Sequence, residues 1–321
     1  GNTGTDTHAK IGIIASSRQE FESVELYPYK EVLRKAKPSS IMSAHLWIQS
    51  IDADTIPATL SKSVMTDLLR DRLHFDGLVF TDAMVMGGIT TRYPFGVATV
   101  KALQAGCDII LFPGDLEKGI EAVREAVKSG ELTEQRIDES VRRILRAKTK
   151  VGLQKNRLTD IDKIPDAVGT AANYQMAKKI AARCLTLAKD DARLIPLQAS
   201  RKVLVLTMSN KAGNSMMSRG LVTFPDEVRK LSPGSTELRL SDSLRTDEFE
   251  KALELARQAD VVLVAAYVRI VLSSGTVDLP AAHAAFLQQL LKQNPHMALV
   301  SFGNPYIGAT VPEIPTYICA Y

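Results

Sequence analysis

A short buried strand that ends in an acidic turn constrains this chain more than any other feature. Residues 75–89 read FDGLVFTDAMVMGGI. Within them, Leu78, Val79 and Phe80 form an apolar run that is typical of a strand covered on both faces of a parallel sheet. Asp82 follows this run, at the strand end where α/β barrels hold catalytic carboxylates. The alternative is that Asp82 caps the next helix, and spacing alone leaves both roles open.

This strand belongs to an alternation of strands and helices over residues 39–128. Further strands are expected at residues 39–48 and 107–112, with helices between and after them. Such a pattern predicts a parallel sheet covered by helices. A second α/β unit is expected from five later strand-like runs. They lie at residues 202–208, 236–240, 261–268, 298–303 and 316–321.

A change in sequence pattern separates the two expected units. Residues 151–170 are rich in loop-forming residues and weakly periodic, so we interpret them as an interdomain linker. A helix is expected at residues 171–187, at the start of the second unit. The expected division is therefore a first domain at 1–150, a linker at 151–170 and a second domain at 171–321.

Composition argues against several classes of function. The 321 residues carry a net charge of +4 without any basic block, so a nucleic-acid partner is not expected. The three cysteines, Cys107, Cys184 and Cys319, lie far apart in the sequence, which indicates neither a disulfide framework nor a metal site. No stretch is long and apolar enough to predict a transmembrane helix.

Two further polar motifs contain histidine. Asp6-Thr7-His8 places an acid two residues from an imidazole in a Gly/Thr-rich loop, where a carboxylate can orient the ring or raise its basicity. The alternative, which spacing alone favours, is a solvated turn. His45 follows Ser43-Ala44 in the strand expected at 39–48. It is expected either to contact a ligand or to be a hydrogen-bonded core histidine.

Taken together, these stretches resemble glycoside hydrolase family 3, and within it the bacterial β-N-acetylglucosaminidases. The resemblance includes GNTGTDTH, VELYPYKEVL, IMSAHL, LLRDRLHFDGLVFTDAMVMGGI and ALQAGCDIILFPGD. It implies an α/β fold, with the C-terminal part of a (β/α)8 TIM-like barrel followed by an α/β sandwich domain. It also implies retaining, exo-acting hydrolysis of terminal β-linked N-acetylglucosamine, in peptidoglycan or chitin-type fragments.

The same resemblance implies roles for individual residues. Asp82 takes the place of the nucleophile, His8 that of the acid/base, and Asp6 that of its partner. His45 and Met84 are expected to contact the carbohydrate substrate. No metal and no organic cofactor are implied. The family suggests the bacterial cell envelope or secretion, with the cytoplasm as the alternative, and it implies no oligomeric state.

Two departures from the family pattern qualify this interpretation. The family's barrel begins well before the Asp-Thr-His loop, so the chain is expected to be a fragment with the last barrel strands only. Residues 268–280, VRIVLSSGTVDLP, lack the Glu that β-glucosidases of the family use as acid, and their one carboxylate is Asp278. This favours the Asp-His mechanism. The alternatives are a family 3 glycosidase or phosphorylase that acts on another β-sugar, and an inactive truncated fragment.

Overall fold

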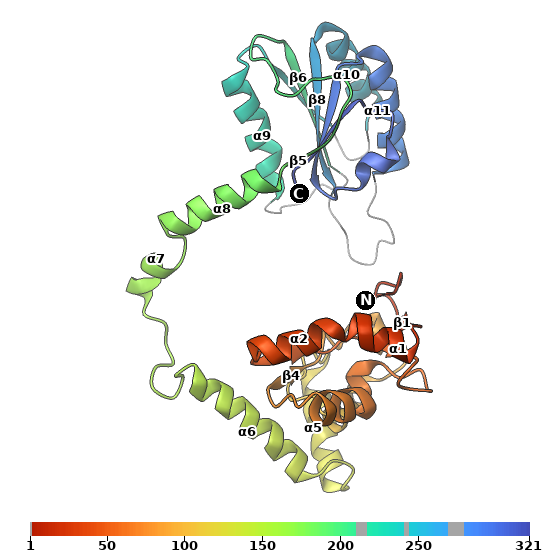
Figure 1. The fold of residues 1–321 in the computed structure, drawn as a ribbon, viewed down its shortest axis with the longest axis vertical. Helices are drawn as coiled ribbons and strands as arrows, with labels where there is room; N and C mark the ends of the chain where they lie inside the picture. The colour runs from red at the N-terminus through yellow and green to blue at the C-terminus, as the bar shows by residue number, and fades with distance from the viewer. Residues whose placement is uncertain (1, 210–216, 241–243, 269–278) are drawn as a thin grey trace. The chain divides into compact units, whose positions relative to one another are not determined.

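The computed structural model describes residues 2–209, 217–240, 244–268 and 279–321 (Figure 1). The chain forms two compact units, Gly1–Thr159 and Asp160–Tyr321, here called unit 1 and unit 2. Both combine helices with parallel strands, and unit 2 holds a mixed sheet, so the expected α/β class is confirmed. The finer expectation, a partial barrel followed by a sandwich, stays a prediction.

Unit 1 is built from short strands and longer helices. Its elements in chain order are β1 (Gly12–Ile14), α1 (Arg18–Glu20), η1 (Phe21–Glu25), α2 (Tyr27–Ala36), β2 (Ser40–Met42), β3 (Leu46–Ile48), η2 (Ala58–Leu60), η3 (Ser63–Arg72), β4 (Leu78–Phe80), α3 (Gly87–Thr90), α4 (Phe95–Ala105), α5 (Leu116–Lys128) and α6 (Glu134–Lys150).

The strand expected at residues 39–48 forms in two parts. Its first part, β2, pairs in parallel with β4, and its second part, β3, pairs in parallel with β1. Between them, the Ser43 N–H donates to the Phe80 carbonyl, while the His45 carbonyl accepts from the Gly12 N–H. The segment therefore changes its pairing partner from β4 to β1 at Ser43–His45.

The strand expected at residues 107–112 is wrong in extent. Only an isolated bridge joins Ile109 to Phe80 of β4. Beyond the bridge, the Leu111 N–H donates to the side-chain oxygen of Thr81, at a distance of 2.9 Å, and not to a main-chain carbonyl. The Thr81 hydroxyl thus takes the place of the next ladder partner, so the segment runs beside β4 without continuing as a strand.

A buried ionic cluster anchors α6 and η3 to β4. The Asp108 carboxylate is fully buried and lies 2.7 Å from Arg70 of η3 and 3.2 Å from Arg143 of α6. It also accepts from the Ser140 hydroxyl at 2.8 Å and from the Val79 N–H at 3.0 Å. A buried carboxylate is tolerated only when it is paired and hydrogen-bonded, and these donors meet that requirement inside the unit.

Unit 2 is built around one six-stranded sheet. Its elements in chain order are η4 (Ile161–Lys163), α7 (Ile164–Ala167), α8 (Ala171–Cys184), β5 (Thr186–Asp190), β6 (Val203–Ser209), α9 (Met217–Leu231), β7 (Thr236–Arg239), α10 (Thr246–Gln258), β8 (Val261–Val268), α11 (Ala281–Gln293), β9 (Met297–Gly303), η5 (Ile307–Thr310) and β10 (Thr316–Cys319).

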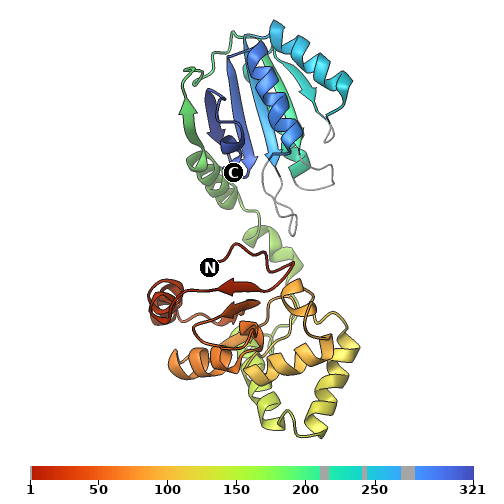
Figure 2. The ribbon, with the colours of Figure 1, turned by 90° about the vertical axis from the view of Figure 1, so that its right-hand side faces the viewer.

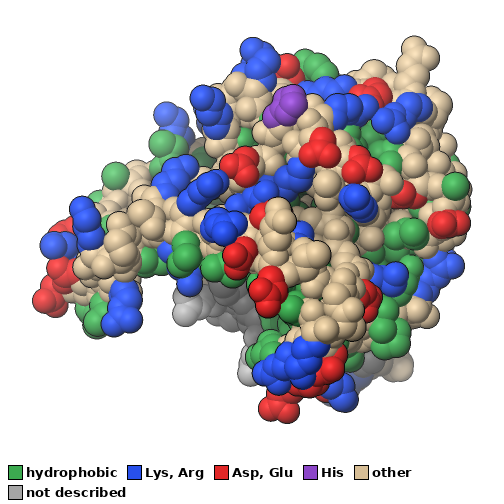
Figure 3. All heavy atoms as spheres, turned by 90° about the horizontal axis from the view of Figure 1, so that it is seen from below, with side chains coloured by type: hydrophobic (Ala, Val, Ile, Leu, Met, Phe, Trp, Pro, Cys, Tyr) green, Lys and Arg blue, Asp and Glu red, His purple; other side chains and the backbone are tan. Residues whose placement is uncertain are grey.

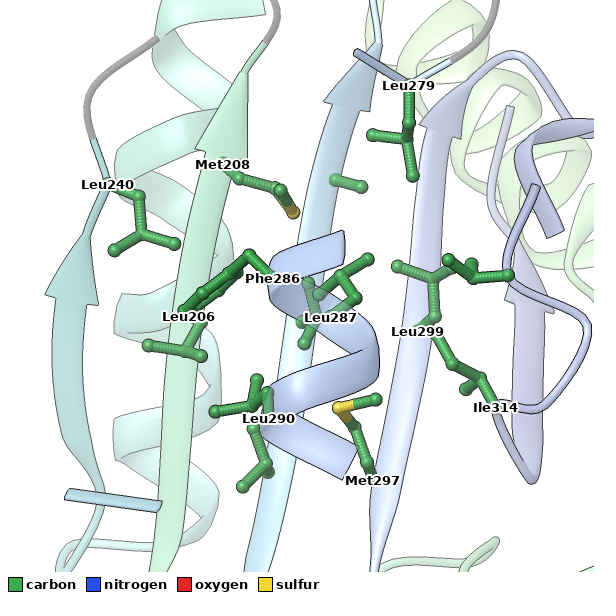
Figure 4. Packing of buried hydrophobic residues seen from close by; sticks show 14 of the residues in the cluster. Leu206, Met208, Leu240, Leu279, Phe286, Leu287, Leu290, Met297, Leu299 and Ile314 are labelled. Carbon is green, nitrogen blue, oxygen red and sulfur yellow. The ribbon is translucent and has the colours of Figure 1, made fainter. Parts of the chain in front are cut away.

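The sheet of unit 2 has the strand order β5-β10-β9-β8-β6-β7 (Figure 2). Side chains alternate between its faces, as the two-residue repeat of a strand requires. Leu206 and Met208 of β6 pack with α10 and α11 in one cluster, while Val203 and Val205 pack with α9 in another. Figure 4 shows Phe286 of α11 inside the first cluster.

One strand of unit 2 was not expected. The helix expected at residues 171–187 ends at Cys184, and Thr186–Asp190 forms β5, antiparallel to β10. The Asp190 carboxylate holds this strand by accepting from the Thr316 hydroxyl of β10 at 2.8 Å. The pairing partner lies at the far end of the chain, so local periodicity could not reveal it.

General surface features follow from composition. Basic and acidic side chains are interspersed on the face in Figure 3, in keeping with a net charge that is spread along the chain. Across the described ranges, no helix combines the length and apolarity needed to cross a membrane.

In the same ranges, no cluster of three His, Cys, Asp or Glu residues could hold a metal ion. Cys107 and Cys319 are buried free thiols, and Cys184 is an exposed one.

Candidate active site

Asp82 lies in the turn just after β4, and its side chain is partly exposed. Its Oδ1 accepts the N–H of Ala83 at 2.7 Å. The next helix, α3, begins at Gly87 with Met86 at its N-cap position. Asp82 therefore does not cap that helix, and the capping alternative is wrong. The carboxylate is left at a strand end, within reach of solvent.

Asp6 and His8 form a close pair in the N-terminal loop of unit 1. Oδ1 of Asp6 lies 2.7 Å from Nδ1 of His8 and also accepts the His8 backbone N–H at 2.9 Å. Each side chain is 39% exposed, so the pair is accessible to solvent. A carboxylate only accepts hydrogen bonds, so Nδ1 must be the donor. In the neutral ring, Nε2 then carries the lone pair and can take up a proton.

The loop with this pair is bonded to the start of α3, the helix that follows Asp82. The Gly87 N–H donates to the His8 carbonyl at 2.9 Å, and the Gly88 N–H donates to the Thr7 carbonyl at 3.1 Å. A Cβ on Gly87 would lie only 2.1 Å from the Ala9 carbonyl oxygen. The two glycines thus allow a backbone approach that side chains would prevent. Gly87 and Gly88 stand out in the sequence as a glycine pair, but the sequence did not reveal that the His8 loop packs on them.

His45 and Met84 lie behind the same turn, and both are enclosed. The His45 side chain is fully buried, with Nδ1 2.9 Å from the Thr59 hydroxyl and Nε2 3.0 Å from the Ala83 carbonyl. Burial lowers the pKa of the His45 imidazole, and the Ala83 carbonyl and the Asp82 charge oppose that shift. Met84 is 1% exposed and belongs to the unit 1 core. This geometry favours the core-histidine alternative, while contact of either residue with a ligand stays a prediction.

Unit 1 also contains a cavity of about 540 Å³, whose lining includes Ser43 and Ala44, the two residues before His45. Its lining is mostly apolar and includes Phe21 of η1, Met42 of β2 and Leu69 of η3. Asp6, His8 and Asp82 are not among its lining residues. A sugar site needs polar groups at the reacting bond, so the chemistry points to the turn after β4 and not to this cavity.

The expected contrast with β-glucosidases rests on residues 268–280. Residues 269–278 of this stretch, with Asp278 among them, lie outside the described residues, so the structure says nothing on that argument.

Comparison with known proteins relates both units to one group of enzymes. Residues 1–147 match the model of the glycosyl hydrolase family 3 N terminal domain. A β-N-acetylglucosaminidase/β-glucosidase from Cellulomonas fimi is 25% identical, over 98% of this chain and 58% of its own length. The structure of a glycoside hydrolase family 3 β-N-acetylglucosaminidase from Paenibacillus sp. is similar with a TM-score of 0.83 and 25% identity, over 100% of this chain and 60% of that one.

A solved β-glucoside phosphorylase is also similar, with a TM-score of 0.82 and 25% identity, over 99% of this chain and 59% of that one. The chain therefore spans less than two thirds of each of these relatives. Hydrolases and a phosphorylase share this fold, so the fold alone does not distinguish the two reactions.

Proposed function

We propose that the protein is a retaining β-N-acetylglucosaminidase, because residues 1–147 match the model of the glycosyl hydrolase family 3 N terminal domain. Its substrate would be a terminal β-linked N-acetylglucosamine, as in fragments of peptidoglycan or chitin. The similarity to N-acetylglucosaminidases from Cellulomonas and Paenibacillus supports this substrate class.

One observation carries the proposal. The loop that holds the Asp6–His8 pair is bonded through its main chain to Gly87 and Gly88, at the start of α3 and five residues beyond Asp82. Two segments that are distant in the sequence thus bring an ionisable imidazole and a carboxylate to the same end of β4. Retaining hydrolysis requires two such groups on either side of the glycosidic bond, about 5 Å apart for paired carboxylates.

In the proposed mechanism, Asp82 attacks the anomeric carbon and forms a glycosyl ester. At the same time His8 gives its proton to the leaving oxygen. His8 then removes a proton from water, which attacks the same carbon and frees the sugar with retained configuration. An imidazole suits both steps because histidine changes its charge near neutral pH. Asp6 keeps the ring oriented through the hydrogen bond to Nδ1.

The finer architecture is part of the same proposal. Residues 1–150 would be the C-terminal part of the family's catalytic barrel, 151–170 a linker, and 171–321 an α/β sandwich domain. The parallel contacts β2–β4 and Phe80–Ile109 support the first assignment, since successive barrel strands pair in this way. We place His45 and Met84 in the wall behind Asp82, next to the bound sugar.

The second candidate is a phosphorylase that acts on another β-sugar, and the similarity to a β-glucoside phosphorylase favours it. Phosphate would then replace water in the second step. The two reactions differ in their products, because a phosphorylase yields a sugar 1-phosphate and a hydrolase yields the free sugar.

One experiment separates these functions. The protein at its natural length, and this 321-residue chain beside it, are incubated with 4-nitrophenyl N-acetyl-β-glucosaminide or 4-nitrophenyl β-glucoside, with and without phosphate. We expect hydrolysis of the first substrate, no dependence on phosphate, and a β-anomer as the first product in proton NMR. A sugar 1-phosphate would support the phosphorylase. No turnover of either substrate by the natural-length protein would contradict both candidates.

A further inference from the structure

A chain of hydrogen bonds runs through the interior of unit 1 and ends at the residue after Asp82. The Ser43 hydroxyl donates to the Thr59 hydroxyl oxygen at 3.0 Å. The Thr59 oxygen lies 2.9 Å from Nδ1 of His45, and Nε2 of His45 lies 3.0 Å from the Ala83 carbonyl. Ser43, Thr59 and His45 are all buried, so water does not compete for these bonds.

The donors and acceptors give this chain a direction. The Ala83 carbonyl can only accept, so Nε2 of His45 carries a proton. Burial favours the neutral ring, in which Nδ1 must accept the proton of the Thr59 hydroxyl. The Thr59 oxygen is then available to accept from Ser43, as the geometry shows. Every polar group in the chain is satisfied in one arrangement, which locks the tautomer of the imidazole.

Ala83 passes the effect of this chain to Asp82. Its carbonyl is held by His45, and its N–H donates to Oδ1 of Asp82 at 2.7 Å. The two ends of one residue thus connect a buried imidazole to a partly exposed carboxylate.

His45 also contacts the segment on the other side of the site. Its main-chain carbonyl accepts from the Gly12 N–H at 3.4 Å, just beyond the loop that holds His8. A Cβ on Gly88 would lie 2.8 Å from the Cβ of His45, so these two residues are in close contact. Gly88 in turn donates to the Thr7 carbonyl. His45 therefore lies between the Asp82 turn and the Asp6–His8 loop.

We propose that His45 is a positioning residue, which holds the Ala83 carbonyl and thereby sets the Asp82 carboxylate relative to the His8 loop. The proposal rests on the function proposed above. This role requires neither a contact of His45 with the sugar nor a proton transfer by His45. The imidazole acts through Ala83, and Thr59 and Ser43 act through the imidazole.

Substitutions along the chain test this role in the natural-length protein. His45→Leu removes the donor to the Ala83 carbonyl and puts an apolar side chain of similar size in its place. His45→Gln keeps an N–H that can reach the same carbonyl. Thr59→Val and Ser43→Ala remove the second and third members. Thr99→Val is the control, because Thr99 is also buried in unit 1 but its hydroxyl donates only to the Phe95 carbonyl of its own helix.

A displaced nucleophile has a recognisable kinetic signature. We expect His45→Leu to lower kcat by about a hundredfold, the loss that a misplacement of about 1 Å can cause, with KM within about twofold. His45→Gln should restore most of kcat. Thr59→Val should lie between them, Ser43→Ala should have the smallest effect, and the control should match the wild type. The loss in His45→Leu should be equal for good and poor leaving groups, because attack by Asp82 is slowed in both cases.

The outcomes separate this inference from the proposed function. Rates are expressed per folded molecule, from thermal melting and urea unfolding of each variant. If wild type turns over a β-glycoside and His45→Leu keeps its kcat per folded molecule, the positioning role is wrong and the proposed function stands. A loss in His45→Gln as large as in His45→Leu would also overturn it. If wild type turns over no β-glycoside, the proposed function fails and this inference fails with it.

Discussion

Nδ1 of His8 lies 2.7 Å from Oδ1 of Asp6, in a loop whose main chain is bonded to Gly87 and Gly88 beyond Asp82. This hydrogen bond joins a carboxylate and an imidazole whose side chains are each 39% exposed. A carboxylate that holds Nδ1 in this way fixes the orientation of the imidazole. The pair is therefore the first place to test the proposed chemistry.

His8→Ala should slow substrates with poor leaving groups most. The general acid is needed to protonate an alkoxide, but a nitrophenolate leaves without a proton. We expect a loss of about 10²–10⁴-fold on a chitobiose-type substrate and a much smaller loss in the first step on a nitrophenyl glycoside. Pre-steady-state release of nitrophenol measures this step. Equal losses on both substrates would remove His8 from the acid role.

Asp82→Asn should remove turnover by on the order of 10⁴-fold or more, because the amide cannot form the glycosyl ester. The amide keeps the size of the carboxylate and can still accept the Ala83 N–H, so the fold should persist. Steady-state kinetics and thermal melting of the same preparation check both parts. A variant that keeps a tenth of the wild-type rate would show that Asp82 is not the nucleophile.

Gly87→Ala should displace the His8 loop. The added Cβ would lie 2.1 Å from the Ala9 carbonyl oxygen, so the backbone must shift. We expect kcat to fall by about ten- to a hundredfold, since a displacement of about 1 Å is sufficient for such a loss. Gly4→Ala is the matched control in the same loop, where a Cβ meets nothing within 4 Å. Similar kinetics of the two variants would show that the docking of the loop has no catalytic role.

Asp108→Asn should destabilise unit 1 strongly. The substitution leaves Arg70 and Arg143 beside a buried neutral amide, and breaking a buried ion pair typically lowers the free energy of unfolding by about 3–5 kcal/mol. Asp138→Asn, which removes an exposed partner of Arg142 on the same helix, should have little effect. Urea unfolding of the natural-length protein compares the two variants. Equal midpoints would contradict the anchoring role of Asp108.

The folded state should lose stability as the pH falls below about 6.5, the ordinary pKa of histidine. Burial lowers the pKa of His45, so the unfolded chain binds a proton at a higher pH than the folded one. The contribution of His45 is therefore fully present above the unfolded pKa and is lost as the pH falls towards the lower folded pKa. Urea unfolding measures the free energy of unfolding at pH 5 and at pH 8. The difference between these two free energies should be smaller in His45→Gln than in wild type. An unchanged difference would contradict this assignment.

The sequence by itself determined the local structure and the chemical groups. The run of residues 261–268 is apolar throughout, and it forms β8 over Val261–Val268, buried along its whole length. Asp82 was placed at a strand end, and Asp6 beside His8, from spacing alone. These features depend on neighbours within a few residues, so their pattern is visible in one stretch of chain.

Only the tertiary structure decided which distant segments meet. The N–H groups of Gly87 and Gly88 donate to the His8 loop, β5 pairs with β10, and His45 is enclosed between Thr59 and Ala83. Each of these contacts joins groups far apart in the sequence, where the bond partner of a backbone amide or an imidazole is set by packing and not by local propensity. The physical reason is that an unpaired polar group is costly inside a protein. Each buried polar group therefore bonds to whichever donor or acceptor the packing of distant segments brings next to it.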